Sequence, residues 1–141
     1  MAAGGANYPV SRTCSLGAGM YAPPPHVNLV VLRSSDIDRG AAFYRQMGLL
    51  FTKHRHGTGP EHYSSEVSGV IFELYPLTPK SSATTGTRIG FRVDSVDSVV
   101  KLLTEIGAVI VSPPADSEWG RRAVVKDFDD HIIELVTPRQ T

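Results

Sequence analysis

Three histidines around one turn are the residues of this chain that best suit proton transfer. His54 and His56 precede the turn 57–60, and His62 follows it. Because imidazole ionises near neutral pH, His56 and His62 could act as general acid and base if they face each other across a hairpin. Binding a metal would require a further carboxylate, which Glu61 or Glu66 could supply. We interpret His54 as an ordinary polar residue at a sheet end.

Two carboxylates, Glu73 and Glu134, lie within apolar stretches that are typical of strands. Side chains alternate between the two faces of a strand, so Glu73 shares its face with Tyr75. An ionised carboxylate among apolar neighbours requires a partner. We therefore expect both carboxylates to be paired or to bind a ligand. Tyr75 joins His56 and His62 as a candidate catalytic residue.

The candidates for binding a substrate combine cations with an aromatic ring. Trp119 follows a Pro-rich loop, and Arg121 and Arg122 begin the strand that is predicted after it. An aromatic wall with a cation suits an anionic or oxygenated small molecule; alternatively, Trp119 packs as a lid over the end of the sheet. Adjacent strand residues point to opposite faces, so only one of the two arginines can point inward. Arg88 is the fourth candidate of this kind.

The elements that hold these residues form two copies of one unit, with a constant offset of 59 residues that places Arg92 on Arg33. Each copy begins with an apolar strand and continues into a helix with apolar residues three and four positions apart, which ends at Gly48 or Gly107. Three strands follow in each copy, and their predicted ranges are 49–56, 62–66 and 70–75 in the first and 108–112, 121–126 and 131–136 in the second. The proline pair 113–114 is assigned to a loop.

Composition and pattern together predict five segments. These are a flexible N-terminal arm (1–25), a first βαβββ module (26–78), a linker (79–86), a second module (87–137) and a tail (138–141). The arm is rich in Gly, Ala, Ser and Pro, and it lacks the cationic start and apolar block of a signal peptide.

The charge balance limits the partners that can be expected. The 14 basic and 14 acidic residues give a formal charge of zero, so electrostatics does not favour binding to nucleic acid or to an anionic membrane. No apolar run is long enough to span a bilayer. Cys14 is the single cysteine, which excludes an intrachain disulfide and favours the reducing cytoplasm. The expected partner is a small molecule.

Two motifs accompany the internal repeat. The first copy carries Asp36-Ile-Asp-Arg-Gly-Ala-Ala-Phe-Tyr44, and the second carries Asp127-Phe-Asp-Asp-His-Ile-Ile-Glu134. They are similar to the D-[LI]-[DE]-x-x-x-x-F-Y helix and the D-P-D-G-x-x-[IV]-E hairpin of the vicinal oxygen chelate superfamily, which includes glyoxalases, bleomycin-resistance proteins and extradiol dioxygenases. The resemblance implies an α+β fold of tandem βαβββ modules, each a curved mixed sheet that forms a cup over a ligand cavity.

The resemblance also implies a set of metal-binding positions, a glutamate near the end of each module and a His or Gln on each first strand. Glu73 and Glu134 match the two glutamates. The constant offset puts Leu29 and Arg88 at the other two positions, and an arginine offers no lone pair. His26 would enter the first position only if three residues were inserted before the helix. In the competing interpretation, Arg88 replaces the metal and its planar donors bridge both carboxylates.

Two function classes remain open. One is an enzyme resembling glyoxalases, epimerases or dioxygenases, in which a divalent metal (Fe, Mn, Ni or Zn) or the pair of His56 and His62 deprotonates an oxygenated substrate. The other is a binder resembling bleomycin-resistance proteins, which sequesters a drug-like ligand. The missing ligands favour a protein without the four-ligand metal site and without a cofactor. The resemblance also implies a homodimer, with the site inside one chain or across the dimer.

Overall fold

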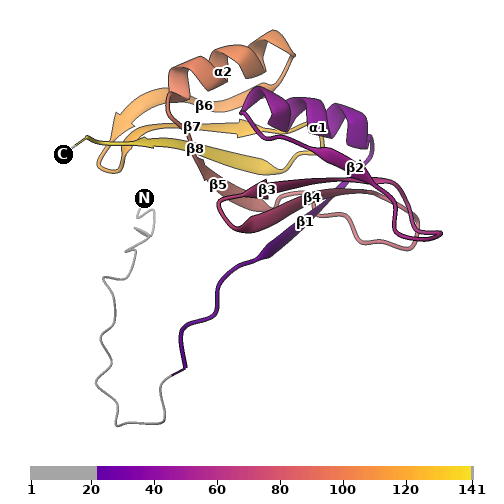
Figure 1. Cartoon of the computed structure of the whole chain (residues 1–141). Helices are drawn as coiled ribbons and strands as arrows, with labels where there is room; N and C mark the ends of the chain where they lie inside the picture. The colour runs from indigo at the N-terminus through magenta and orange to yellow at the C-terminus, as the bar shows by residue number, and fades with distance from the viewer. Residues whose placement is uncertain (1–21, 141) are drawn as a thin grey trace.

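The structure of the chain, a computed structural model, describes residues 22–140 and contains two repeats of one strand and helix order (Figure 1). The first repeat contains β1 (Leu29–Ser34), α1 (Ile37–Gln46), β2 (Thr52–His54), β3 (His62–Val67) and β4 (Val70–Pro76). The second contains β5 (Arg88–Arg92), α2 (Val96–Glu105), β6 (Val109–Ser117), β7 (Gly120–Lys126) and β8 (Ile132–Pro138). The expected arm up to residue 21, with Cys14, lies outside the described range.

Both sheets have the same topology, which confirms the duplication. The strand orders are β1-β4-β3-β2 and β5-β8-β7-β6, with the first strand of each module parallel to the last and the other neighbours antiparallel. Glu73 pairs with Val31, and Glu134 pairs with Gly90. Val31 and Gly90 differ by the predicted offset of 59 residues. The α+β fold of two mixed sheets is therefore confirmed.

Each helix begins at a capped residue and buries one face. The Asp36 carboxylate accepts the Arg39 amide at the start of α1, and the Ser95 hydroxyl accepts the Ser98 amide at the start of α2, which satisfies amides that a helix leaves free. Both helices lie on the same side of the molecule, at the top of Figure 1. Each helix has ten residues, and neither could cross a membrane.

One hydrophobic core runs through both modules. On β4 and β8 the residues that face the helices are buried, while the alternating set is only partly buried. The ring of Phe91, from the second module, lies 5.8 Å from that of Phe72 and 6.2 Å from that of Tyr44 in the first. Phe128, in the turn before β8, packs edge-on against Phe43 of α1. The two modules therefore share their apolar interior.

The predicted loop at prolines 113–114 is wrong, because β6 runs through them from Val109 to Ser117. β6 is an edge strand, where a missing amide donor is tolerated, and its register with β7 shifts between Ile110 and Ser112 and again between Ser112 and Ala115. The predicted strand 49–56 is also too long, since β2 contains three residues.

Candidate functional site

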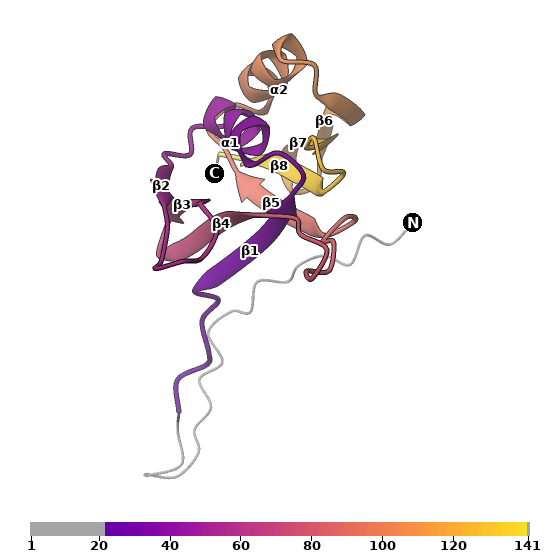
Figure 2. The ribbon, with the colours of Figure 1, turned by 90° about the vertical axis from the view of Figure 1, so that its right-hand side faces the viewer.

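The faces of the two sheets that turn away from the helices carry most of the candidate residues. In Figure 2, α1 and α2 lie together on the upper side of the molecule, and β1 and β4 lie below them. On β4, Phe72 and Leu74 are buried towards the helices, whereas Glu73 and Tyr75 lie on the other face. We call these two helix-free faces the open faces of the first and second sheet.

A row of neighbouring rings crosses the open face of the first sheet, in which Tyr75 stacks on His62 and His54 stacks on His56. The rings of Tyr75 and His62 are stacked, with centroids 4.1 Å apart and planes 10° apart. The His56 ring follows at 5.1 Å from His62, and His54 lies 6.0 Å from His62. At the other end of the row, the Arg33 guanidinium lies 5.2 Å from the centroid of Tyr75. His54, interpreted as an ordinary polar residue, therefore belongs to the same cluster as the other two histidines.

His62 contacts two groups that could exchange a proton with it. Its side chain is 1% exposed, and Nδ1 lies 3.3 Å from the Pro60 carbonyl oxygen, which can only accept a hydrogen bond. Nε2 therefore faces the Glu73 carboxylate and the Tyr75 hydroxyl, each at 3.4 Å. As a neutral imidazole it can accept from Tyr75, and as an imidazolium it can donate to Glu73.

Two arginines share one carboxylate on the open face of the second sheet. Arg88 Nη2 lies 3.0 Å from Glu134 Oε1, and Arg122 forms an ion pair with the same oxygen. Hydrogen bonding from Arg88, and then from Arg122, lowers the pKa of the Glu134 carboxyl below its ordinary value of 4.5, although partial burial acts in the opposite direction. The carboxylate is therefore ionised and engaged at neutral pH.

The structure corrects the predicted bridge between the two glutamates. Arg88 pairs with Glu134, while Glu73 pairs with His62. The Arg88 side chain is 51% exposed, and half-exposed ion pairs contribute only about 0–1 kcal/mol to stability. Removing Arg88 is therefore not expected to unfold the chain, contrary to the interpretation of a buried ion pair.

Of the two adjacent arginines, Arg122 is the one on the open face. Arg122 pairs with Val136 in the sheet register, on the face of Glu134. Arg121 lies on the opposite face, where it pairs with Asp97 of α2 at 2.9 Å and with Asp116 at 3.3 Å. Those hydrogen bonds raise the pKa of Arg121. Its predicted role in binding a substrate is therefore not supported by its position.

The other two candidates lie at the ends of elements. Trp119 occupies the turn between β6 and β7 and is 38% exposed. His26 is exposed and lies three residues before β1. The strand register places Leu29 beside Ile71 and Arg88 beside Ile132, so the alternative that moves His26 into the first strand is wrong. Across residues 22–140, no three His, Cys, Asp or Glu side chains are grouped so that they could hold a metal ion.

The most completely paired carboxylate of the described chain is one that sequence analysis did not select. Asp127 Oδ2 accepts the Tyr44 hydroxyl at 2.5 Å and His131 Nδ1 at 2.6 Å, and its other oxygen accepts two backbone amides. Burial alone would raise the pKa of Asp127, but the hydrogen bonds from His131 and Tyr44 hold it below its ordinary value of 3.8. Burial and the neighbouring carboxylate raise the pKa of Tyr44 well above 10.

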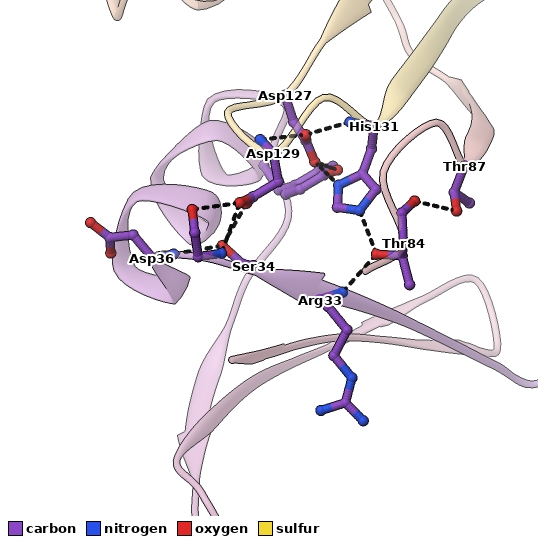
Figure 3. Close-up of polar contacts among 10 residues, drawn as sticks. Arg33, Ser34, Asp36, Thr84, Thr87, Asp127, Asp129 and His131 are labelled. Carbon is purple, nitrogen blue, oxygen red and sulfur yellow. Dashed lines mark hydrogen bonds and ion pairs between the residues drawn. The ribbon is translucent and has the colours of Figure 1, made fainter. Parts of the chain in front are cut away.

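This network continues into the linker (Figure 3). His131 Nε2 lies 2.6 Å from Thr84 Oγ1, and that oxygen accepts the Arg33 amide at 2.9 Å. Because the Asp127 carboxylate can only accept, His131 donates from Nδ1, and the Thr84 hydroxyl donates to Nε2. Every donor in the row then has an acceptor. The linker is thereby attached to both modules.

A second carboxylate of the same turn binds the first module. Asp129 accepts hydrogen bonds from the Ser34 hydroxyl at 2.6 Å and from the Ser35 amide and hydroxyl at 2.8 Å each. Figure 3 shows this carboxylate next to the end of β1, on the opposite side of the turn from Thr84. We call Asp127, Asp129, His131 and Thr84 the intermodule network. In the sequence, the signal for this network is the pair of Asp127 and His131, four residues apart in a stretch with apolar residues on both sides.

A cleft of about 290 Å³ lies where the first module meets β5. Its walls are mostly apolar, with one acidic and one basic residue, and the lining residues are Met47, Gly48, Leu49, Leu50, Glu66, Val67, Phe91, Arg92 and Val93. Glu66, a possible further ligand beside the histidine turn, is among them, whereas the predicted catalytic and substrate-binding residues are not.

Comparison with known proteins identifies relatives over most of the chain. The family model of the glyoxalase/bleomycin resistance protein/dioxygenase superfamily matches residues 26–135. An uncharacterized protein of Mycolicibacterium smegmatis is 30% identical over 113 residues, which are 79% of this chain and 93% of that protein.

Solved structures of related proteins have the same fold. TnmS3, an antibiotic binding protein from Streptomyces sp. CB03234, aligns with a TM-score of 0.67 and 24% identity over 84% of this chain and all of its own. TioX from Micromonospora sp. ML1 aligns with a TM-score of 0.63 and 24% identity over 82% of this chain and all of its own. At 24% identity, this similarity shows a shared fold and nothing more.

Proposed function

This chain belongs to the glyoxalase/bleomycin resistance protein/dioxygenase superfamily, and from that premise we propose that it binds a small oxygenated molecule on its open faces without the four-ligand metal site of the metal-dependent members. The observation that carries the proposal is the pairing of Arg88 and Arg122 with Glu134. The two guanidinium groups occupy the Glu134 carboxylate oxygen that a metal ion would have to bind.

The residues at the expected ligand positions do not fit a metal. Leu29 and Arg88 have no lone pair to donate, and the strand register keeps both at the first-strand positions. Of the two glutamates, Glu73 is in contact with His62, and Glu134 binds two guanidinium groups. A metal would have to displace the two guanidinium groups before it could bind Glu134.

A role as a binder is also supported by the proteins that share the fold. One of them is described as an antibiotic binding protein. The open face of the first sheet offers a row of rings against which a ligand could stack, and the second sheet offers guanidinium donors. Such a combination of apolar surface and few polar anchors is typical of small-molecule sites. Sequestration of a drug-like compound is the form of this function that we propose first.

Two measurements test the proposal. Elemental analysis of protein purified without chelators or a histidine tag, and again after incubation with Mn, Fe, Ni and Zn and desalting, should find far less than one metal per chain. A screen by thermal shift, with the fluorescence of Trp119 as a second readout, should find small oxygenated ligands. One metal per chain, lost in Glu134→Ala, would overturn the metal-free proposal.

A second candidate function, a metal-free enzyme of proton transfer, is favoured by the position of His62. This buried imidazole contacts both Glu73 and Tyr75, so a proton removed from a substrate could be passed between three groups. The bound compounds should then be converted, and the double substitution of His56 and His62 should abolish conversion. Unchanged turnover in that variant would exclude this function.

We also propose that the protein acts as a homodimer in the cytoplasm. Leu29, at the edge of the first open face, is 50% exposed, and pairing of two copies would cover it. The single cysteine supports a reducing compartment. Sedimentation velocity should give the mass of two chains, and a single-chain mass at micromolar concentration would contradict the first part.

A further inference from the structure

The open face of the second sheet carries an excess of positive charge in a chain whose formal charge is zero. By strand register this face includes Arg88 and Arg92 of β5 and Arg122 and Lys126 of β7. Glu134 is the one carboxylate on β5, β7 and β8. By register this face therefore carries four cations and a single anion, and two of the cations, Arg88 and Arg122, contact that anion.

Glu134 holds two of these cations in a convergent arrangement. Arg88 and Arg122 approach the same oxygen, Oε1, from different strands. A guanidinium has five N–H donors, and a contact of this kind uses only part of them. The remaining donors of both side chains are held near one another before any ligand arrives. Such pre-organisation reduces the entropy that binding would otherwise remove.

The surroundings of the pair suit a group that is partly removed from water. The side chains of Arg122 and Glu134 are each 28% exposed, while Arg88 is 51% exposed. Ile132 and Val136, which share this face of β8 with Glu134, are partly buried apolar residues. An anion that reaches the two arginines would therefore meet them beside apolar surface, where charge-assisted hydrogen bonds are stronger than in bulk water.

We propose that the ligand of this protein carries an acidic group, a carboxylate or a similar oxyanion, that binds between Arg88 and Arg122. The proposal rests on the function proposed above and names the chemical class of its ligand. Glu134 acts as a positioning residue, because it orients both guanidiniums without contacting the ligand. The apolar part of the ligand lies over the neighbouring apolar residues of the sheet.

The test compares organic acids with their neutral amides. The full chain is titrated calorimetrically with a panel of matched pairs, beginning with 2-naphthoate and 2-naphthamide. The acids should bind at least about tenfold more tightly, as expected for a charge-assisted contact to two arginines. Raising the salt concentration should weaken binding of the acids more than that of the amides. Inorganic phosphate as a competitor distinguishes an oxyanion site from one that requires the carbon skeleton.

Three arginine variants give the controls. Arg88→Gln and Arg122→Gln should each reduce the preference for the acid at least about threefold. Arg121→Gln, one residue away on the opposite face, should keep it. Because Arg88 is half exposed, Arg88→Gln should fold even if Arg122→Gln does not. The melting temperature of each variant shows whether it is folded.

The outcomes separate this inference from the proposed function. Equal affinity for acids and amides, or equal losses in the Arg121 variant, would overturn the acidic-group proposal and leave small-molecule binding intact. Binding of neutral compounds alone would likewise overturn the acidic-group proposal and leave small-molecule binding intact. A panel in which nothing binds, together with a blank ligand screen, would overturn both.

Discussion

At the scale of single residues, the buried Asp127 is the group whose environment is most strongly defined. It is 5% exposed, and its two oxygens accept four hydrogen bonds from both modules. Those bonds favour the ionised carboxylate, which is why its pKa lies below 3.8 despite burial. The charge is thus a structural element of the junction between the modules.

Replacement of Asp127 by asparagine should destabilise the protein by about 3 kcal/mol, because the amide leaves His131 Nδ1 or the Tyr44 hydroxyl without an acceptor in a buried place. Since the folded pKa is depressed, the carboxylate stabilises the fold above its unfolded pKa of about 4, and this contribution is lost as the pH falls through the folded value. Urea unfolding between neutral and acidic pH measures both effects. The variant should lose part of the acid dependence.

Asp130→Asn is the matched control for that substitution. Asp130 is exposed in the same turn, with a φ of 61° that asparagine also tolerates. The free energy of unfolding of the Asp130→Asn variant should stay close to that of the parent protein. An Asp127→Asn variant that is equally stable and has the same acid dependence would show that the hydrogen bonds of the carboxylate contribute nothing.

Several properties of single residues follow from the sequence, and others do not. Alternation along strands predicts that Glu73 and Tyr75 share a face, and this is confirmed. Arg88 was predicted as a partner of Glu134, and this pair is present. The other partners, His62 of Glu73 and Arg122 of Glu134, were not predicted, because they come from strands whose register depends on the whole sheet. For the same reason, nothing local decides that Arg122 and not Arg121 points to the open face.

At the scale of elements, β7 depends on a glycine at its first residue. Gly120 has a φ of 125°, and a Cβ there would collide with the carbonyl oxygen of Thr137 and lie 2.9 Å from the Cα of Pro138. Any other residue would push β7 away from β8 at the hairpin that carries Trp119. This close approach was not predicted, since the loop was assigned to prolines 113–114 and the turn directly before β7 was not identified from the sequence.

Gly120→Ala should therefore destabilise the protein by about 3 kcal/mol, from backbone strain together with the steric overlap. Gly107→Ala is the matched comparison, because Gly107 has a φ of 85° but an added methyl group there would meet no atom within 4 Å. It should lose only about 1 kcal/mol, the strain of a left-handed residue. Thermal unfolding of the two variants should separate strain from collision, and equal melting temperatures would contradict the steric argument.

At the scale of the whole molecule, the two modules share one interior. Phe91 of β5 packs against both Tyr44 and Phe72, and Phe128 packs against Phe43. The internal repeat predicts two similar units, but it contains no information on which faces of the copies meet. The aromatic residues at the junction break the repeat, and that is the physical reason why the arrangement of the modules could not be read from the sequence.

A shared interior predicts that both modules unfold together. The fluorescence of Trp119, in the second module, and hydrogen exchange of α1, in the first, should report the same free energy of unfolding. Phe91→Ala should lower both values equally, by about 3 kcal/mol. Val109→Ala, which removes an exposed side chain from the outer edge of β6, should lower neither by more than about 0.5 kcal/mol. Separate transitions for the two probes would show that the modules are independent.

The linker has one further effect through Thr84. β1 is an edge strand, and the Arg33 amide on its outer side would be free to pair with a strand of another molecule. The Thr84 hydroxyl oxygen accepts that amide, and His131 in turn fixes the hydroxyl. The segment that joins the modules thus also guards a sheet edge against intermolecular β-pairing. Loss of the Thr84 hydroxyl would therefore free the Arg33 amide for pairing with another molecule.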